Sequence, residues 1–192
     1  MVPSPRTSFT DPLRIGELPA GVRGGLIGIT FCPGKQGDSV VGRPWARDLG
    51  LDLDVVERWG ARLVLTLVES HELAFLGVPD LGPRVMARGI AWRHLPIVDV
   101  QPPGREFDEA WPHAGAEAIA RLRAGERVLV HCRGGLGRAG TVAACLLVEC
   151  DQPPAAAIRA VRAARPGAIE TLAQQRFVER YLPCFGPGGG GA

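Results

Sequence analysis

Cys132 and Arg138, a cysteine and an arginine with five residues between them, are the side chains of this sequence best suited to do chemistry. Three of the five intervening residues are glycines, which let the backbone turn inward so that successive N–H groups surround an anion. The planar guanidinium of Arg138 adds donors for two oxygens of a tetrahedral oxyanion. A thiol in such a positive field should lose its proton easily. The spacing therefore predicts a thiolate directed at a bound phosphoryl group.

Two apolar segments are expected to position this loop. Residues 127–131 are short, apolar and preceded by a glycine, which predicts a buried strand, and residues 139–150 are almost uncharged and long enough for a core helix. The loop then joins the C-terminal end of a strand to a helix N-terminus. Free N–H groups and the helix dipole favour an anion there.

Parts of the loop also match two nucleotide-binding motifs. Residues 135–140 satisfy G-x-G-x-x-G, but two prolines and another helical pattern follow where a dinucleotide site requires a second strand with an acidic residue. Residues 135–141 lack the lysine of a nucleotide-binding P-loop. Both motifs are therefore excluded. A cysteine with a purely structural role at a tight turn remains as the alternative.

The run H-C-x-x-G-x-x-R, residues 131–138, resembles the signature of the protein tyrosine and dual-specificity phosphatases. Residues 131–147 and 167–171 are similar to the kinase-associated phosphatase branch of that superfamily, and looser similarity extends through residues 32–34 and 94–99. The resemblance implies an α/β fold of the dual-specificity phosphatase type. It also implies a cysteine-dependent protein phosphatase acting on phosphotyrosine, phosphoserine or phosphothreonine, with no metal and no cofactor.

The resemblance assigns roles to individual residues. Cys132 would be the nucleophile that forms a cysteinyl-phosphate, Arg138 would bind the phosphoryl group and its transition state, and Gln174 would help to position the hydrolytic water. His131 would fix the loop and tune the thiol. The loop residues expected to bind phosphate are Arg133, Gly134, Gly135, Leu136, Gly137 and Arg138.

The leaving group needs a proton donor, for which Asp99 is the best candidate. It follows a predicted strand over residues 92–97, on a loop with two prolines and a glycine that should lie beside Cys132. The family takes its acid from such an aspartate roughly thirty residues before the cysteine. Asp108 is the alternative acid, although its place near the start of the next helix suits an N-cap better.

One position departs from the family pattern. Members usually place Ser or Thr directly after the loop arginine, where the hydroxyl stabilises the departing thiolate, but this chain has Ala139. The loss of one hydrogen bond to a charged sulfur costs about 1.5–3 kcal/mol, or roughly ten- to a hundredfold in phosphoenzyme hydrolysis. Thr141 is not expected to replace it. We therefore expect a slower enzyme that accumulates phosphoenzyme.

The whole chain of 192 residues, 46% of them hydrophobic, suffices for one α/β domain, which we expect over residues 13–185. Strand and helix patterns alternate along it, which predicts a central, mostly parallel sheet flanked by helices. Residues 1–12 are expected to form a flexible arm and residues 186–192 a flexible glycine-rich tail.

Composition restricts the partners and the compartment. Five cysteines without C-x-x-C spacing predict no metal site and a reducing compartment, the cytoplasm. A net charge of +2 without a basic run argues against nucleic acid, and no apolar segment is long enough to span a membrane. We expect a monomer that acts on a phosphoprotein. Cys32 should be structural, with a redox role as the alternative, and the stripe of Arg159, Arg162 and Arg165 should be a solvated helix face.

The substrate class leaves alternatives open. No phosphotyrosine-recognition loop is evident, which favours the compact dual-specificity type. Phosphoinositide enzymes of this fold tend to carry extra lysines in the loop, whereas only Arg133 accompanies Arg138 here, so lipid or inositol phosphates rank second. A phosphate-binding module of low turnover, or a thiol-based transferase, is the alternative of a different class.

Overall fold

The computed structural model describes residues 4–20, 23–39 and 42–186. A five-stranded sheet in the order β1-β2-β7-β5-β6 lies at its centre. Its strands are β1 (Gly16–Ala20), β2 (Gly25–Phe31), β5 (Ala61–Thr66), β6 (Ala91–His94) and β7 (Arg127–Cys132). Among the described strands of this sheet, β1 pairs antiparallel with β2, and the other neighbouring strands pair in parallel. A separate two-stranded ribbon is formed by β3 (Gln36–Gly37) and β4 (Trp45–Ala46).

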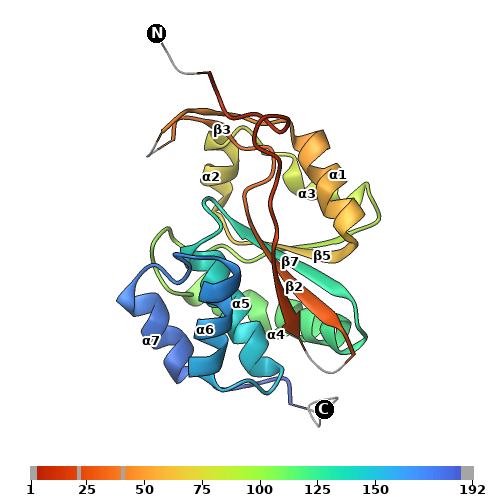
Figure 1. The fold of residues 1–192 in the computed structure, drawn as a ribbon. Helices are drawn as coiled ribbons and strands as arrows, with labels where there is room; N and C mark the ends of the chain where they lie inside the picture. The colour runs from red at the N-terminus through yellow and green to blue at the C-terminus, as the bar shows by residue number, and fades with distance from the viewer. Residues whose placement is uncertain (1–3, 21–22, 40–41, 187–192) are drawn as a thin grey trace.

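Helices cover both faces of the sheet (Figure 1). One face carries α1 (Leu49–Trp59), α2 (Ser70–Phe75) and α3 (Leu81–Met86), and the other carries α4 (Arg105–Arg123), α5 (Gly137–Glu149), α6 (Pro154–Ala164) and α7 (Leu172–Arg180). The predicted mostly parallel sheet flanked by helices is confirmed. In the part of the chain that the structure describes, no helix has the length and apolarity needed to cross a membrane.

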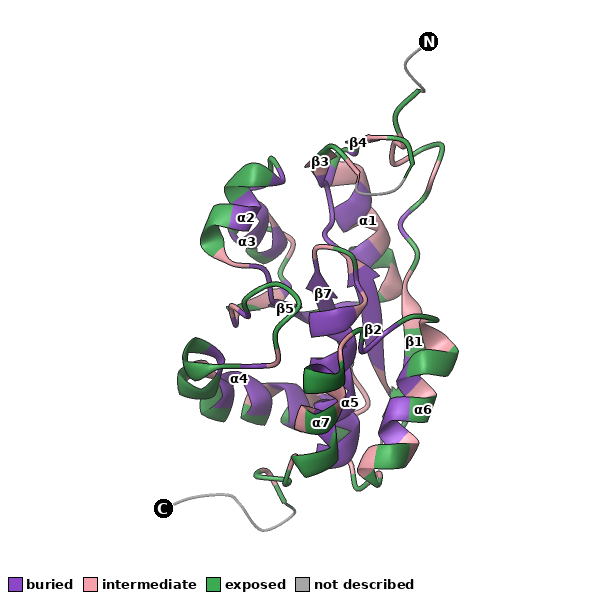
Figure 2. Ribbon diagram, turned by 90° about the vertical axis from the view of Figure 1, so that its left-hand side faces the viewer, coloured by how far each residue is buried: buried purple, intermediate pink, exposed green. Residues whose placement is uncertain are grey.

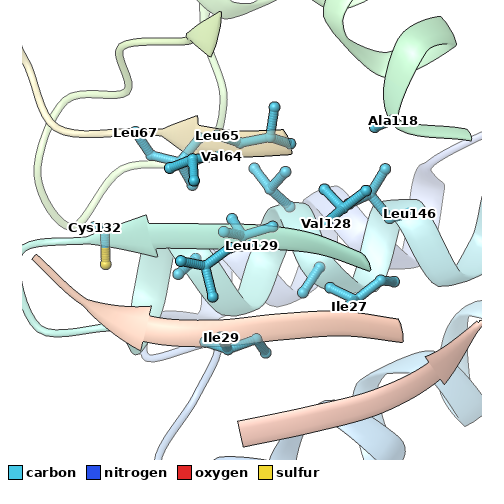
Figure 3. Close-up of a cluster of buried hydrophobic side chains, with 14 of the residues drawn as sticks. Ile27, Ile29, Val64, Leu65, Leu67, Ala118, Val128, Leu129, Cys132 and Leu146 are labelled. Atoms are coloured by element: carbon cyan, nitrogen blue, oxygen red, sulfur yellow. The ribbon is translucent and has the colours of Figure 1, made fainter. Parts of the chain in front are cut away.

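The central strand β7 and the helix α5 that follows it are the most deeply buried elements. β7 pairs with β2 on one side and β5 on the other, and its side chains pack into the cores on both faces of the sheet (Figure 3). A parallel strand covered on both faces needs a continuous apolar run, which residues 128–130 provide. Every residue of α5 is buried (Figure 2). These two elements therefore hold the loop between them on a rigid support.

Part of the predicted N-terminal arm is bound to the domain. The Arg6 N–H donates to the carbonyl of Pro44 at 2.8 Å, and the Ala46 N–H donates to the carbonyl of Arg6 at 3.0 Å. The Arg6 guanidinium also stacks on the Trp45 ring, 3.6 Å from its centroid. These partners lie some forty residues away, so a local composition rich in proline, serine and threonine does not reveal them. Residues 1–3 and 187–192 of the expected arm and tail lie outside the described residues.

Candidate active site

Cys132 ends β7 and lies at the base of the loop, with 3% of its surface exposed. Its sulfur accepts a hydrogen bond from the Gly135 N–H at 3.2 Å. Gly135 has φ of +70°, and a Cβ there would lie 2.5 Å from the backbone of Thr30 and Phe31, so glycine is required. The loop therefore wraps closely around the thiol.

Two cations hold the outer side of the loop. The Lys35 Nζ donates to the carbonyl of Arg133 at 3.2 Å, and Arg165 donates to the carbonyls of Gly134 and Gly135 at 3.3 and 3.1 Å. The C=O and N–H of a trans peptide point in opposite directions. Holding these three carbonyls outward favours an inward direction for the N–H groups that follow them, and the Gly135 N–H does contact the thiol. The loop of residues 132–138, with its N–H groups around the thiol, is called the cup below. The sequence predicted the N–H donors of the cup but did not reveal Lys35 and Arg165, the two cations that orient them.

The arginine stripe on α6 is only partly the solvated face that its spacing predicts. Arg159 is exposed, as expected. Arg162 is also exposed, and it donates to the carbonyls of Ala168 and Ile169 at 3.3 Å. Arg165 is half-buried and holds the loop, so the expectation of a solvated face is wrong for Arg165, whose partners come from a segment that a helical pattern does not show.

Arg138 is buried in the first turn of α5, with 1% of its surface exposed. Glu72 accepts from both ends of its guanidinium, at 2.5 and 2.9 Å, and the carbonyl of Ile97 accepts at 2.9 Å. Burial lowers the pKa of Arg138, but the hydrogen bonds to Glu72 and the nearby negative groups raise it overall. Its Nε–H is buried and has no acceptor among the described residues. A buried unsatisfied donor costs about 1–3 kcal/mol, which an oxyanion in the cup would relieve.

Glu72 is a site residue that the sequence did not reveal. It lies on the opposite face of the sheet from α5, in α2, where its side chain also accepts the Glu69 N–H at 2.9 Å. Burial favours a raised pKa for Glu72, but the hydrogen bonds from Arg138 and from the Glu69 N–H lower it overall. In the sequence, a glutamate in the first turn of a short helix indicates only a capping interaction.

Asp99, which was expected beside Cys132, contacts Arg138 of the same loop. Its Oδ1 is 2.9 Å from the Arg138 Nη2, and its side chain is 51% exposed. The same oxygen accepts the N–H of Val100, whose φ of +58° is rare for a β-branched residue. Asp108 is exposed within α4, and the N-cap of that helix is Gly104, so the expected capping role of Asp108 is wrong.

Gln174 is fully buried and contacts the loop that carries Asp99. Its Oε1 accepts the Thr171 N–H and its Nε2 donates to the carbonyl of Gln101, both at 3.2 Å. Glu170, which the sequence analysis did not consider, reaches the cup itself and accepts the Gly137 N–H at 2.7 Å. The role of Gln174 in placing a water stays a prediction, and its observed contacts hold the Asp99 loop against α7.

His131 is a buried, neutral ring. Burial lowers its pKa to about 3. Its Nε2 lies 2.7 Å from the Thr66 hydroxyl, which accepts the indole N–H of Trp92 at 2.8 Å. This chain of bonds ties β7 to β5 and β6 next to the nucleophile.

Cys32 follows β2, next to the loop, and is fully buried. Its thiol donates to the carbonyl of Pro33 at 3.7 Å, and burial raises its pKa. A protonated, enclosed thiol is a poor nucleophile, which favours the structural role over the redox role.

Ala139 is fully buried beside Arg138, and among residues 4–20, 23–39 and 42–186 no hydroxyl hydrogen-bonds to the Cys132 sulfur, which accepts from the Gly135 N–H. The hydroxyl of Thr141 donates to the carbonyl of Gly137 at 2.8 Å, within α5. We expect Ala139→Ser to raise steady-state kcat about tenfold, because the new hydroxyl stabilises the thiolate as the phosphoenzyme breaks down. Rapid-quench kinetics on para-nitrophenyl phosphate would show a smaller initial burst.

The matched control for that substitution is Ala143→Ser, which adds a hydroxyl one turn further along the same buried helix. It should leave kcat and the burst unchanged. An unchanged kcat in Ala139→Ser would mean that phosphoenzyme hydrolysis does not limit turnover.

The described geometry can be compared with known proteins. A family model, PTP-SAK, described as a Swiss Army Knife protein, DSP-PTPase phosphatase domain, matches residues 51–178. This span includes the cysteine loop, Asp99, Glu72 and Gln174. The chain belongs to the dual-specificity and protein tyrosine phosphatases.

Individual phosphatases of this family share much of the chain. Cyclin-dependent kinase inhibitor 3 of Rattus norvegicus is 31% identical over 159 residues, which cover 81% of this chain and 71% of the relative. Protein tyrosine phosphatase type IVA 2 of Mus musculus is 32% identical over 120 residues, which cover 62% of this chain and 68% of the relative. The predicted resemblance to the kinase-associated branch is confirmed.

Solved structures agree with the fold of this phosphatase. Kinase-associated phosphatase, crystallised with serine in place of its catalytic-site cysteine, superposes with a TM-score of 0.74 at 27% identity, covering 86% of this chain and 92% of that chain. Tk-PTP in its active form superposes with a TM-score of 0.63 at 29% identity, covering 85% of this chain and 98% of that chain. The chain is therefore a cysteine-dependent protein phosphatase, a phosphoric monoester hydrolase, as the sequence predicts.

Proposed function

We propose that Cys132 is the nucleophile of this phosphatase and that its substrate is a phosphorylated tyrosine, serine or threonine of a protein. The thiolate attacks phosphorus, an S–P bond forms, and the P–O bond to the substrate breaks. The carboxyl group of Asp99 gives its proton to the departing oxygen. Water then attacks the cysteinyl-phosphate, Asp99 takes a proton from it, and the products are inorganic phosphate and the thiolate.

The observation that carries this proposal is the arrangement of Cys132, its glycine-rich loop and the buried Arg138 guanidinium within one loop-to-helix segment. The Gly135 N–H contacts the thiol, the carbonyls of the loop are held outward, and Arg138 is aligned by Glu72 with one buried N–H left without an acceptor. Preorganised donors of this kind stabilise the charge that develops on a transferring phosphoryl group. In the substrate complex, a phosphoryl oxygen takes the place of Asp99 on the Arg138 Nη2, which leaves the carboxyl group free to face the leaving oxygen.

The rim of the site supports a protein substrate over an inositol or lipid phosphate. Val98 and Val100, which flank Asp99, are 58% and 53% exposed, and Leu172 at the start of α7 is 60% exposed. Phe75 is 65% exposed beside the guanidinium of Arg133, which lies 5.5 Å from the centroid of its ring. Exposed apolar side chains at the rim fit a phosphorylated peptide segment, whereas a polyphosphorylated inositol ring requires a cluster of cations.

The test is a comparison of kcat/KM at one pH and ionic strength. Peptides carrying phosphotyrosine or phosphothreonine should be hydrolysed at least about tenfold more efficiently than inositol polyphosphates or phosphatidylinositol phosphates in vesicles. A Phe75→Ser, Val98→Ser double variant should lower kcat/KM for the peptides without changing that for para-nitrophenyl phosphate. Higher efficiency on the inositol or lipid substrates would overturn the proposed substrate class.

Asp99→Asn tests the role of Asp99 as the proton donor while the nucleophile Cys132 stays in place. It should slow hydrolysis of a phosphopeptide, whose leaving group needs a proton, by about a hundredfold. Hydrolysis of an activated aryl phosphate, which loses a stable phenolate, should slow much less. Equal losses on both substrates would assign Asp99 to binding instead.

We also propose that the enzyme works in a reducing compartment, the cytoplasm. All five cysteines, none of them in a disulfide, support this location. Fractionation of the cells that express the protein tests it, and recovery in an oxidising compartment would contradict it.

A further inference from the structure

Lys35, which donates to the cysteine loop, is a buried cation whose charge the proposed reaction does not use. It is 6% exposed, and its ammonium lies over the rings of Phe31 and Trp45, 4.5 and 4.0 Å from their centroids. Its one hydrogen bond goes to the carbonyl of Arg133 in the loop. Within residues 4–20, 23–39 and 42–186, no carboxylate is within ion-pair distance of it. A buried charge normally has a counter-ion, so this ammonium calls for one.

The segment that carries Lys35 is built to hold it in place. Gly34 has φ of +73°, packs against Leu49 and donates its N–H to Asp52 at 2.8 Å. Asp52 is in turn paired with Arg47 at 2.8 Å, and both side chains are almost completely buried. A buried ion pair beneath a tight glycine turn is a rigid support, which a lysine at a random surface position does not have.

The charged and titratable groups facing Lys35 come from four segments of the chain. Burial is the main cause that lowers its pKa, to about 8, and Arg6 and Arg47 act in the same direction. Cys32 and Cys132 act in the opposite direction and favour the charged form. Of these two thiols Cys32 is the larger cause, but burial raises the pKa of Cys32 and keeps it protonated, so the cysteine loop is the side from which a negative charge can stabilise this ammonium.

We propose that Lys35 is a positioning residue of the phosphoryl site, which holds the Arg133 carbonyl outward and places a positive charge behind the cup. This inference rests on the phosphoryl site proposed above. With the carbonyl of Arg133 fixed, the N–H of Gly134 points into the cup, where it donates to the oxyanion. The ammonium and the bound dianion stabilise each other, so the site binds a dianion best while Lys35 is protonated.

The sign of the pH dependence follows from this coupling. Lys35 is charged below its pKa and neutral above it, so affinity for a dianion should fall as pH rises through about 8. Tungstate is a suitable probe because it remains a dianion across that range. Cys132→Ser, in the full-length chain, removes the reactive sulfur from the cup, so that the probe measures binding alone.

The experiment measures the Kd of tungstate for Cys132→Ser by calorimetry from pH 6.5 to 9.5 at constant ionic strength. Affinity should fall about tenfold across this interval, because a bound dianion that raises the pKa of Lys35 by about one unit binds about tenfold more tightly to the protonated lysine than to the neutral one. Adding Lys35→Met should weaken binding about tenfold at pH 6.5 and remove the pH dependence. Adding Lys35→Arg should keep tight binding at both ends of the range, because a guanidinium does not titrate there.

Gln36→Met is the matched control. Its amide donates to the carbonyls of Gly34 and Arg47 in the same segment, so the substitution perturbs the support without removing a charge. It should keep both the affinity and the pH dependence. A pH-independent Kd in Cys132→Ser, or a loss in Gln36→Met equal to that in Lys35→Met, would overturn the role of Lys35. No tungstate binding at all would instead overturn the phosphoryl site itself.

Discussion

Replacing Cys132 by serine lowers kcat for para-nitrophenyl phosphate by about 10⁴-fold or more, because an alcohol cannot supply the nucleophile that a thiolate provides. The hydroxyl takes the place of a sulfur that is 97% buried and already accepts a loop N–H, so the cup itself should persist. Tungstate should therefore still bind. Steady-state kinetics and calorimetry on the same preparation measure the two effects separately.

Cys150→Ser is the control for this substitution, since that cysteine lies at the opposite end of α5 from the loop and is only half-buried. It should leave kcat unchanged. Mass spectrometry should find phosphate on the tryptic peptide 128–133 of the unsubstituted enzyme, quenched during turnover, and none on that of Cys132→Ser. Turnover that survives without Cys132 would remove the mechanism proposed for this phosphatase.

The cup could be predicted from the sequence because its parts are local. A buried strand, a glycine-rich turn and a buried helix follow one another over residues 127–149, and each has its own pattern of residue types. The structure also shows which glycines the turn requires. Gly135 has no room for a Cβ because the backbone of Thr30 and Phe31 is in the way, a Cβ on Gly137 would meet the ends of the Glu170 and Gln174 side chains, and Gly134 has open space. Composition alone could not make that distinction.

The residues that the sequence missed all reach the site from far along the chain. Glu72 is 66 residues before Arg138, Lys35 is 98 residues before Arg133, and Arg165 follows Gly135 by 30. Each also has an ordinary local explanation, as a capping residue, a turn residue or part of a solvated helix face. Only the packing of α2, the β2–β3 connection and α6 around one sheet edge brings these charges together, and no spacing rule encodes that packing.

Asp99 was predictable for a different reason. It follows a parallel strand, and the C-terminal ends of parallel strands meet at one edge of the sheet. The contacts that hold its loop were not predictable, because they come from Thr171 and Gln174 at the start of α7, about seventy residues later. The position of Asp99 after a parallel strand places it at the site, and the contacts with Thr171 and Gln174 fix the loop that carries it.

Arg138→Lys should lower kcat/KM by about 10³-fold, because an ammonium cannot reproduce the planar fork that binds a phosphoryl group in the transition state. Glu72 accepts hydrogen bonds from both terminal nitrogens of the Arg138 guanidinium, so we expect it to act only through that guanidinium. Glu72→Gln should therefore lower kcat/KM by a smaller factor, about ten- to a hundredfold, because a neutral amide aligns the guanidinium less well. Kinetics of the native enzyme, both single variants and the double variant form the cycle that measures this dependence.

The double variant should be no slower than Arg138→Lys alone, because Glu72 has nothing left to align once the guanidinium is gone. The pair also predicts how stability depends on pH. Since the pKa of Glu72 is lowered in the folded state, the stabilisation is complete above the ordinary pKa of a glutamate and is lost as the pH falls toward the lowered value. Glu72→Gln should remove that acid-sensitive part of the unfolding free energy. Losses in kcat/KM that simply multiply in the double variant would show that Glu72 contributes to catalysis by a route that does not pass through Arg138.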